Sequence, residues 1–238
     1  MTIAHHTLEV IGTIHSPYRQ KFAIPRQPGL VTAATATIEL HGAYAHPDCV
    51  RGLAEFSHIW VLFLFHQTIA GGWKPLVRPP RLGGDVKKGV FASRATYRPN
   101  GIGMSVLQLK QIESDSDGTR IIVQGADLVD GTPIIDIKPY LPYSDALPMA
   151  TGGYADSRPQ TELTTRFSDV AQAQLAQFAP AYPQLAELID QVLRQDPRPA
   201  YKRSDLKNKT YGMNLFDLNI KWQVIGTENH VISITKDF

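Results

Sequence analysis

Residues 59–65 read IWVLFLF, the longest uninterrupted apolar run in the chain. Seven residues are typical of one β-strand, and a membrane-spanning helix needs about 20. Shorter runs rich in β-branched and aromatic residues precede and follow it, with glycines and prolines mainly between them. Short strands separated by turn signals favour an all-β sandwich or barrel over alternating strands and helices.

The strands expected in this first part of the chain are 8–14, 35–40, 59–65, 90–96, 105–112, 120–124 and 132–137. The polar stretch 113–118 predicts a hairpin turn, and 48–56 predicts a short helix before the apolar strand. Residues 143–160 are rich in Pro, Gly, Ser and Ala and lack periodicity, which is typical of a domain boundary. We therefore expect a mainly β domain over 1–145, a linker over 146–160 and a smaller α+β domain over 161–238.

The second domain shows helical patterning. Ser168 is a suitable N-cap for a helix that runs to about Phe178. Pro183 suits the first turn of a second helix, because proline is tolerated where the backbone N–H has no helical partner. One face of that helix would be apolar, through Leu185, Leu188, Ile189 and Val192. Residues 215–225 and 231–235 predict a closing hairpin.

Composition indicates an ordinary globular protein, with 43% hydrophobic and 19% charged residues. The N-terminus lacks both the basic region and the apolar core of a signal peptide. A single cysteine, Cys49, excludes an intrachain disulfide and suits a reducing compartment. We expect a cytoplasmic protein without a membrane segment, in which Cys49 is a small semi-buried thiol rather than a nucleophile.

The net charge of +2 conceals a local excess of positive charge. Seven basic residues and one acid, Asp85, lie between Lys74 and Arg98, and six basic residues and two acids lie between Arg194 and Lys209. The first run favours contact with a polyanion, because solvated surface charge is usually mixed in sign. The second is compatible with a solvated loop after a helix or with a second contact to RNA phosphates. The candidate RNA contacts are Arg78, Arg81, Lys87, Lys88, Tyr97, Arg98, Arg198, Lys202 and Arg203.

Common catalytic signatures are missing. The chain has no GxxxxGK[ST], no HExxH, no GxSxG and no cysteine pair, so we expect no P-loop, no metal site and no hydrolase elbow. The loop FAIPRQPGL at 22–30 can present guanidinium and amide donors or be a plain surface turn. The stretch RPNGIG at 98–103 predicts a loop whose backbone closely approaches a ligand.

Further candidates lie at predicted strand ends. His66 and Gln67 end the apolar strand, where binding groups are common, and a purely structural histidine is equally compatible. Arg94 and Arg98 flank the end of another predicted strand. The run DLVDGTP at 127–133, followed by DIKPY at 136–140, concentrates acids around one turn. Each of these features has an ordinary structural explanation when it is taken singly.

Together these features resemble the TrmO (YaeB/TsaA-like) family of S-adenosylmethionine-dependent tRNA methyltransferases. The resemblance covers nearly the whole chain. It rests on IGTIHSPY (11–18), FAIPRQPGL (22–30), VRGLAEFSHIWVLFLFH (50–66), RPPRLGG (78–84), GVFASRATYRPNGIGMS (89–105), DLVDGTPIIDIKPYLPY (127–143), DPRPAYKR (196–203) and NLFDLNIKW (214–222).

The resemblance implies a single-sheet antiparallel β-barrel methyltransferase domain and a homodimer that binds S-adenosylmethionine near the subunit interface. It also implies a substrate, N(6)-threonylcarbamoyladenosine at position 37 of threonine tRNAs, and methylation of its N(6) nitrogen. The cofactor-binding residues that it implies are Pro25, Arg26, Gln27, His66, Gln67, Arg94, Met104, Leu128, Asp130, Gly131 and Thr132.

The implied chemistry needs little from the protein beyond alignment, because the cofactor carries the reactive methyl group. The exocyclic nitrogen is a poor nucleophile, so a proton acceptor would help, and Asp130 and Asp136 are the candidates. Arg94 or Arg98 would pair with the carboxylate of the substrate. Two other classes compete: a noncatalytic RNA-binding module, and a small-molecule enzyme that uses Cys49 or His66.

Overall fold

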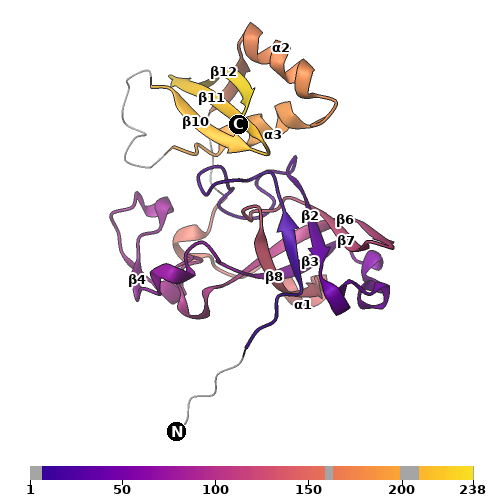
Figure 1. The fold of residues 1–238 in the computed structure, drawn as a ribbon. Coiled ribbons are helices and arrows are strands. Elements are labelled where there is room, and N and C mark those ends of the chain that lie inside the picture. Colours follow the sequence, from indigo (N-terminus) through magenta and orange to yellow (C-terminus); the bar gives the residue numbers. More distant parts are fainter. Residues whose placement is uncertain (1–6, 159–162, 199–208, 238) are drawn as a thin grey trace.

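The computed structural model describes residues 7–158, 163–198 and 209–237. Its N-terminal part is a closed barrel of six antiparallel strands, which follow one another around the barrel in the order β1-β2-β7-β6-β3-β8 (Figure 1). These strands are β1 (Gly12–His15), β2 (Thr35–Leu40), β3 (His58–Leu64), β6 (Ile102–Asp115), β7 (Gly118–Gln124) and β8 (Thr132–Pro139). The predicted mainly β fold is confirmed.

Alternation along the strands fills the barrel. In β3 the buried residues Ile59, Val61 and Phe63 alternate with partly exposed ones, because successive side chains of a strand point to opposite faces. Removing this apolar surface from water stabilises the barrel, at about 25 cal/mol per Å². The core inside the barrel also contains the buried side chains of Ile14, Ile38, Leu107, Ile121, Val123 and Ile134.

One predicted strand, 90–96, is wrong. The structure has a 3-10 turn (Val90–Ala92) there, preceded by a two-stranded ladder of β4 (Leu76–Val77) and β5 (Lys88–Gly89). Val90 is buried, but Phe91 is 77% exposed, so only one residue of the apolar run contributes to packing. The run is too short to alternate, and it lacks a neighbouring strand to pair with in the described structure.

The prediction of one short helix over 48–56 is also wrong. Two 3-10 turns, Pro47–Val50 and Leu53–Glu55, are separated by Gly52 at φ 81°. A left-handed residue interrupts a helix, and glycine adopts that conformation without steric cost. The other short turns are Gly42–Ala45, Ile69–Gly71, Pro80–Leu82, Pro99–Gly101 and Gly153–Ala155, and α1 is a single turn over Pro142–Asp145.

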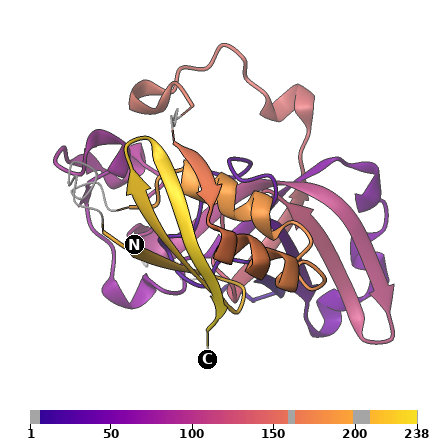
Figure 2. The ribbon, with the colours of Figure 1, turned by 90° about the horizontal axis from the view of Figure 1, so that it is seen from above.

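The C-terminal part is a four-stranded sheet, with β9 (Thr164–Phe167) parallel to β12 (Glu228–Lys236) and the rest antiparallel. Strands β10 (Tyr211–Leu215) and β11 (Leu218–Ile225) complete it. Helices α2 (Asp169–Phe178) and α3 (Leu185–Arg194) lie on one side of the sheet, and the whole unit lies over the barrel (Figure 2). The predicted α+β domain is confirmed.

Local signals place both helices. The Ser168 hydroxyl accepts the Ala171 N–H at 3.1 Å, so the predicted cap of α2 is confirmed. Helix α3 begins at Leu185, two residues after Pro183, so that proline lies just outside the first turn. Its predicted apolar face is buried against the sheet through Leu185, Leu188, Ile189 and Val192.

Residues 17–34, here called the shared segment, join the two parts. Tyr18, Ala23 and Val31 are buried in the core formed by the C-terminal sheet and helices. Tyr18 forms a β-bridge with Leu215, and the Phe216 N–H donates to the Pro17 carbonyl at 2.8 Å. A stretch that the sequence assigns to the N-terminal domain therefore completes the C-terminal core.

Candidate active site

A cavity of about 530 Å³ opens where the shared segment meets the barrel. Five stretches line it: the shared segment, the end of β3 with the turn after it, the loop 93–98, the start of β6, and the turn 127–132 before β8. A volume of this size is typical of small-molecule and cofactor sites. The walls are mainly apolar, through residues that include Ile24, Phe63, Phe65, Ile102 and Leu128.

Nine of the eleven predicted cofactor-binding residues line this cavity: Pro25, Arg26, Gln27, His66, Gln67, Arg94, Met104, Leu128 and Thr132. The other two, Asp130 and Gly131, belong to the same turn as Leu128 but do not line the cavity. Tyr97 and Arg98, predicted as RNA contacts, line it as well. Residues from all five stretches thus meet in one place.

Donor groups gather on one side of the cavity. Arg94 Nη1 donates to Gln27 Oε1 at 2.6 Å, which ties the loop 93–98 to the PRQ stretch. Arg26 and His66 lie in the same lining. Guanidinium, amide and imidazole N–H groups together suit a carboxylate ligand. Arg94 follows a bend rather than a strand, so its predicted position at a strand end is wrong.

The glycines of RPNGIG are explained by the chain's own packing. A Cβ on Gly103 would lie 2.4 Å from the Phe63 ring and 2.8 Å from the Phe65 ring, and Gly103 is part of β6 rather than of a loop. At Gly101, where φ is +60°, a Cβ would lie 2.9 Å from Ile69. The chain's own packing thus accounts for both glycines, and because Gly103 also lines the cavity, close approach of this backbone to a ligand stays a prediction.

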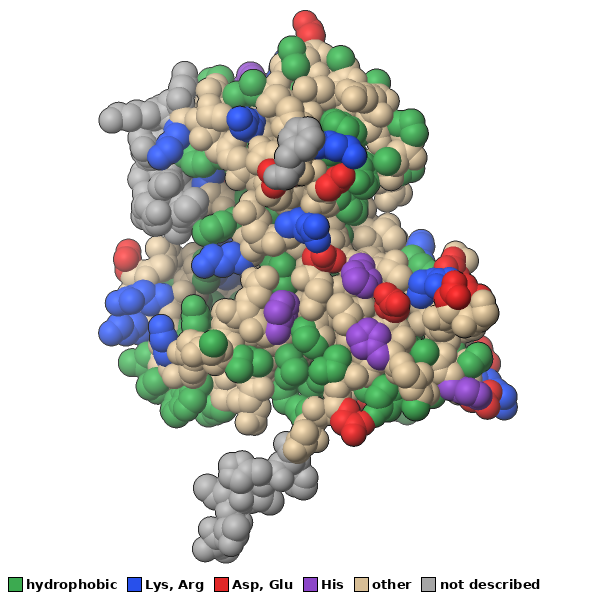
Figure 3. Space-filling view, viewed as in Figure 1, with side chains coloured by type: hydrophobic (Ala, Val, Ile, Leu, Met, Phe, Trp, Pro, Cys, Tyr) green, Lys and Arg blue, Asp and Glu red, His purple; other side chains and the backbone are tan. Residues whose placement is uncertain are grey.

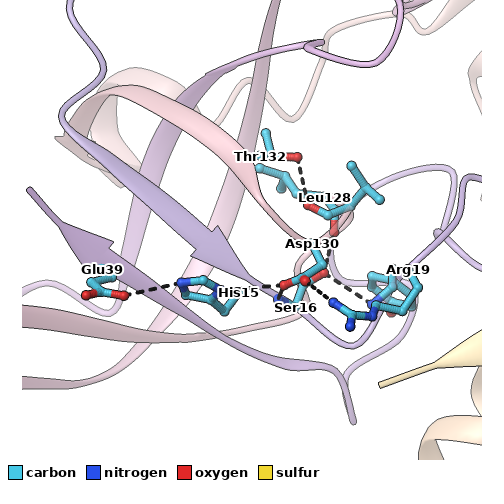
Figure 4. Close-up of polar contacts among 9 residues, drawn as sticks. His15, Ser16, Arg19, Glu39, Leu128, Asp130 and Thr132 are labelled. Atoms are coloured by element: carbon cyan, nitrogen blue, oxygen red, sulfur yellow. Dashed lines mark hydrogen bonds and ion pairs between the residues drawn. The ribbon is translucent and has the colours of Figure 1, made fainter. Parts of the chain in front are cut away.

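Asp130 is held in a network outside the cavity (Figure 4). Its Oδ1 accepts the Ser16 N–H at 3.1 Å, and its Oδ2 pairs with Arg19 Nη1 at 2.5 Å. The Ser16 hydroxyl donates to the Leu128 carbonyl at 2.7 Å, which fastens the turn to the end of β1. These contacts give Asp130 a structural task, and its role as a proton acceptor stays a prediction.

Asp136 lies elsewhere. It contributes to a second hollow on a different part of the barrel, beside Cys49, which is exposed rather than semi-buried as predicted. Its Oδ2 pairs with Lys138 Nζ at 2.8 Å, and its Oδ1 accepts the Ile137 N–H. The structure therefore does not bring Asp136 to the cavity that gathers the predicted cofactor residues, and its catalytic role also stays a prediction.

The sequence reasoning missed Asp127 and Ser105, which both line the cavity. Ser105 Oγ donates to Asp127 Oδ1 at 2.6 Å. Burial raises the pKa of Asp127 to about 6, against the opposing effects of the Ser105 hydrogen bond and the Arg94 charge. Asp127 begins the DLVDGTP run, but nothing in the sequence distinguished it from Asp130. No group of three or more metal-ligating side chains occurs in the described residues.

The predicted RNA contacts fall into two groups. Lys and Arg side chains gather around β4 and β5 (Figure 3), where Arg78 and Lys87 are exposed. Arg81 donates to the Ser157 backbone carbonyl and hydroxyl. Arg198 is only 10% exposed and is paired with Asp196 at 2.8 Å, so little of it is available to phosphate. Lys202 and Arg203 lie outside the described residues.

Fold and cavity define a class, a β-barrel ligand-binding domain joined to a small α+β domain. The sequence profile of the tRNA-methyltransferase O N-terminal domain matches residues 13–146, and that of the TrmO C-terminal domain matches 160–237. The chain belongs to the TrmO family. No helix in the described ranges has the length and apolar character to cross a membrane.

Individual relatives agree with this assignment. The chain is 51% identical, over 91% of its length and 92% of the relative, to the tRNA (adenine(37)-N6)-methyltransferase of Escherichia coli. It is 46% identical, over the same shares, to a Pseudomonas aeruginosa protein whose name includes "S-adenosylmethionine-dependent methyltransferase". A crystal structure of TrmO from Pseudomonas aeruginosa superposes with a TM-score of 0.82 at 39% identity, and covers 98% of this chain and 100% of its own.

Proposed function

We propose that this protein transfers the methyl group of S-adenosylmethionine to the N(6) nitrogen of adenosine 37 in tRNA. Its substrate is the N(6)-threonylcarbamoyl form of that nucleoside in threonine tRNAs. The observation that carries the proposal is the meeting of the PRQ stretch, His66–Gln67, Arg94 and the turn 127–132 around one cavity in a TrmO-family chain.

The residues of the cavity fit this cofactor. Arg26, Gln27 and His66 offer donors for its carboxylate, and the apolar walls suit its adenine and thioether parts. When bound there, S-adenosylmethionine supplies an electrophilic methyl group on a positively charged sulfur. The protein's tasks are to hold the two reactants in line and to exclude water, and alignment alone can lower the barrier by about 7–11 kcal/mol.

Residues at the edge of the cavity suit a single-stranded nucleotide. Tyr97 lies in the lining, with Lys74 Nζ 4.7 Å from its ring centroid, and an aromatic face can stack an unpaired base. Arg98, whose Nη1 donates to the Ser93 carbonyl, lies where a cation can pair with the threonyl carboxylate. Arg78, Lys87 and Lys88 would neutralise phosphates, which supplies affinity rather than specificity.

The working unit is a cytoplasmic homodimer. Met104 lies on β6 at the edge of the cavity and is 50% exposed, and a second copy that covers it would bury apolar surface beside the cofactor. The family resemblance supports both the dimer and the compartment. Analytical ultracentrifugation tests the dimer directly, and a monomer at micromolar concentration would contradict it.

The function is tested by methyl transfer from labelled S-adenosylmethionine to threonine tRNA, with and without the threonylcarbamoyl group. Label on the modified tRNA alone would support both the reaction and the substrate. Label on both tRNAs would support the reaction and remove the requirement for prior modification. Absence of label on either, together with absence of cofactor binding, would reject the methyltransferase.

A further inference from the structure

One carboxylate faces the cavity. Among the described residues that line it, Asp127 is the only aspartate or glutamate. Asp130, three positions later, accepts from Ser16 and Arg19 outside the lining, and Asp136 lies by the second hollow. A proton acceptor must come within hydrogen-bond reach of the group that it deprotonates. Asp127 lines the cavity in which the methyl transfer is proposed, whereas the carboxylates of Asp130 and Asp136 are engaged elsewhere.

The Asp127 carboxylate is also held in one orientation by a hydrogen bond. Ser105 follows Met104 on β6, and its hydroxyl donates to Asp127 Oδ1 at 2.6 Å, a short bond to a carboxylate. Ser105 itself is 2% exposed, so the donor is fixed by its strand. This bond occupies one oxygen of the carboxylate, and Oδ2 is the oxygen on which a substrate proton can be placed.

The surroundings tune Asp127 for proton transfer near neutrality. Burial raises its pKa to about 6, and the Ser105 hydroxyl and the Arg94 guanidinium act in the opposite direction. The Tyr18 hydroxyl, which belongs to the shared segment, is the other titratable group that interacts with it. Burial, followed by the Asp127 charge, raises the pKa of Tyr18, so this phenol stays protonated. At pH 7 Asp127 is therefore mostly ionised and is more basic than an exposed aspartate.

We propose, on the basis of the methyl transfer proposed above, that Asp127 accepts the proton from the substrate's N(6) nitrogen and that Ser105 positions it. The nitrogen lone pair forms the new bond to the methyl carbon, and the carbon–sulfur bonding pair stays on sulfur. The proton lost from nitrogen passes to Asp127 Oδ2 and then to water. Charge balances, because the sulfonium becomes a neutral thioether and the carboxylate a neutral acid.

The first test compares Asp127→Asn with the wild-type protein. Amide substitution keeps the shape and removes the proton acceptor, so kcat should fall by about 10²–10⁴-fold. Calorimetric titration with S-adenosylhomocysteine should show a Kd changed by less than about threefold, as expected for a residue that acts in the chemical step. The matched control is Asp117→Asn in the β6–β7 turn, an exposed carboxylate far from the cavity. A kcat for Asp127→Asn within threefold of wild type would overturn the proposal.

The second test uses Ser105→Ala, which removes a hydrogen bond that stabilises the ionised form. The acid limb of the kcat–pH profile, expected near pH 6, should then move to higher pH. Carbon-13 NMR titration of the cofactor-free protein gives a readout without turnover: the Asp127 carboxyl should titrate near pH 6 and higher in Ser105→Ala. If neither the acid limb of the kcat–pH profile nor the NMR titration of Asp127 moves in Ser105→Ala, the role of Ser105 is overturned.

The same assays separate the role of Asp127 from the methyl transfer itself. A wild-type enzyme that is active, with an equally active Asp127→Asn variant, removes only the proton acceptor. A wild-type protein that transfers no methyl group to either form of tRNA removes the proposed function and this role with it.

Discussion

Asp127 and Asp130 are three residues apart and differ in what surrounds their carboxylates. Asp127 faces the cavity and has one hydroxyl donor, whereas Asp130 is tied to Ser16 and Arg19 (Figure 4). Ionisation of the Asp127 carboxylate in its surroundings therefore costs stability. The hydrogen bonds of Asp130 instead stabilise the turn that contains it. Substitutions at the two positions should therefore change stability in opposite directions.

Asp127→Asn should stabilise the protein above pH 6. Because the folded-state pKa is raised to about 6, the folded state binds the proton more tightly than the unfolded chain. The stability that proton binding to Asp127 adds to the folded state is thus fully present below about pH 4 and is lost as pH rises through 6. Relative to its value at pH 4, the stability difference between variant and wild type should grow by about 2 kcal/mol at pH 7. Urea unfolding at both pH values measures this, and a difference independent of pH would contradict it.

Asp130→Ala should destabilise the protein by about 1–3 kcal/mol, because it leaves the Ser16 N–H and the Arg19 guanidinium without their acceptor. The turn 128–132 would loosen, so affinity for S-adenosylhomocysteine should fall as well. Asp136→Ala is the control, since its pairing with Lys138 is exposed and should contribute under about 1 kcal/mol. Equal losses in the two variants, measured by chemical denaturation, would count against the structural role.

Among the elements, the shared segment connects the C-terminal helices to the cavity. Helix α3 presents Gln191, whose Oε1 accepts the Ala33 N–H at 2.9 Å and whose Nε2 donates to Thr32. The same segment carries Pro25, Arg26 and Gln27 into the lining. The C-terminal domain therefore helps to fix a wall of the cavity, although none of its own described residues is in the lining.

Gln191→Ala should raise the KM for S-adenosylmethionine by severalfold and leave kcat nearly unchanged. The loss corresponds to about 1 kcal/mol, one hydrogen bond to a backbone donor. Gln172→Ala is the matched control, because Gln172 Nε2 donates to the Phe167 carbonyl within the C-terminal domain. A change in kcat alone, or an equal effect of the control, would show that the segment is not positioned through α3.

Local sequence patterns predicted those strands and helices whose formation depends mainly on their own residues. The apolar run 59–65 and the Ser168 cap both needed only neighbouring sequence, and each appears within a residue or two of its expected place. The 90–96 segment failed because strand formation requires a partner that no local pattern reveals. The packing of Tyr18 into the C-terminal core, and the meeting of Asp127 with Ser105, depend on contacts between distant segments.

For the whole molecule, positive charge gathers around β4 and β5 (Figure 3), and the chain runs on from β5 to Tyr97 in the cavity lining. A tRNA that places its anticodon loop at the cavity needs additional phosphate contacts to fix its orientation. The β4–β5 ladder and the residues between its strands are suited to this, because Arg78 and Lys87 are exposed.

Replacing both Lys87 and Lys88 with alanine should weaken tRNA binding without changing S-adenosylhomocysteine affinity. If each lysine meets a phosphate, the slope of log K against log salt should become less steep by about 2. Lys221→Ala, an exposed charge on β11 of the C-terminal sheet, is the control for nonspecific loss of charge. An unchanged salt slope would place the tRNA on another surface.

Tyr18 and its neighbours complete the C-terminal core, and Gly29 and Ala34 of the same segment hydrogen-bond to Gly125 beside the barrel, so residues 17–34 tie the C-terminal core to the barrel. Heat should therefore melt both parts together. Differential scanning calorimetry should show a single endotherm whose van't Hoff and calorimetric enthalpies agree, and two resolved transitions would show that the parts come apart independently. Unfolding should therefore remove the cavity wall formed by residues 17–34 and the C-terminal domain in one event, so partly unfolded molecules that keep one of them should not persist.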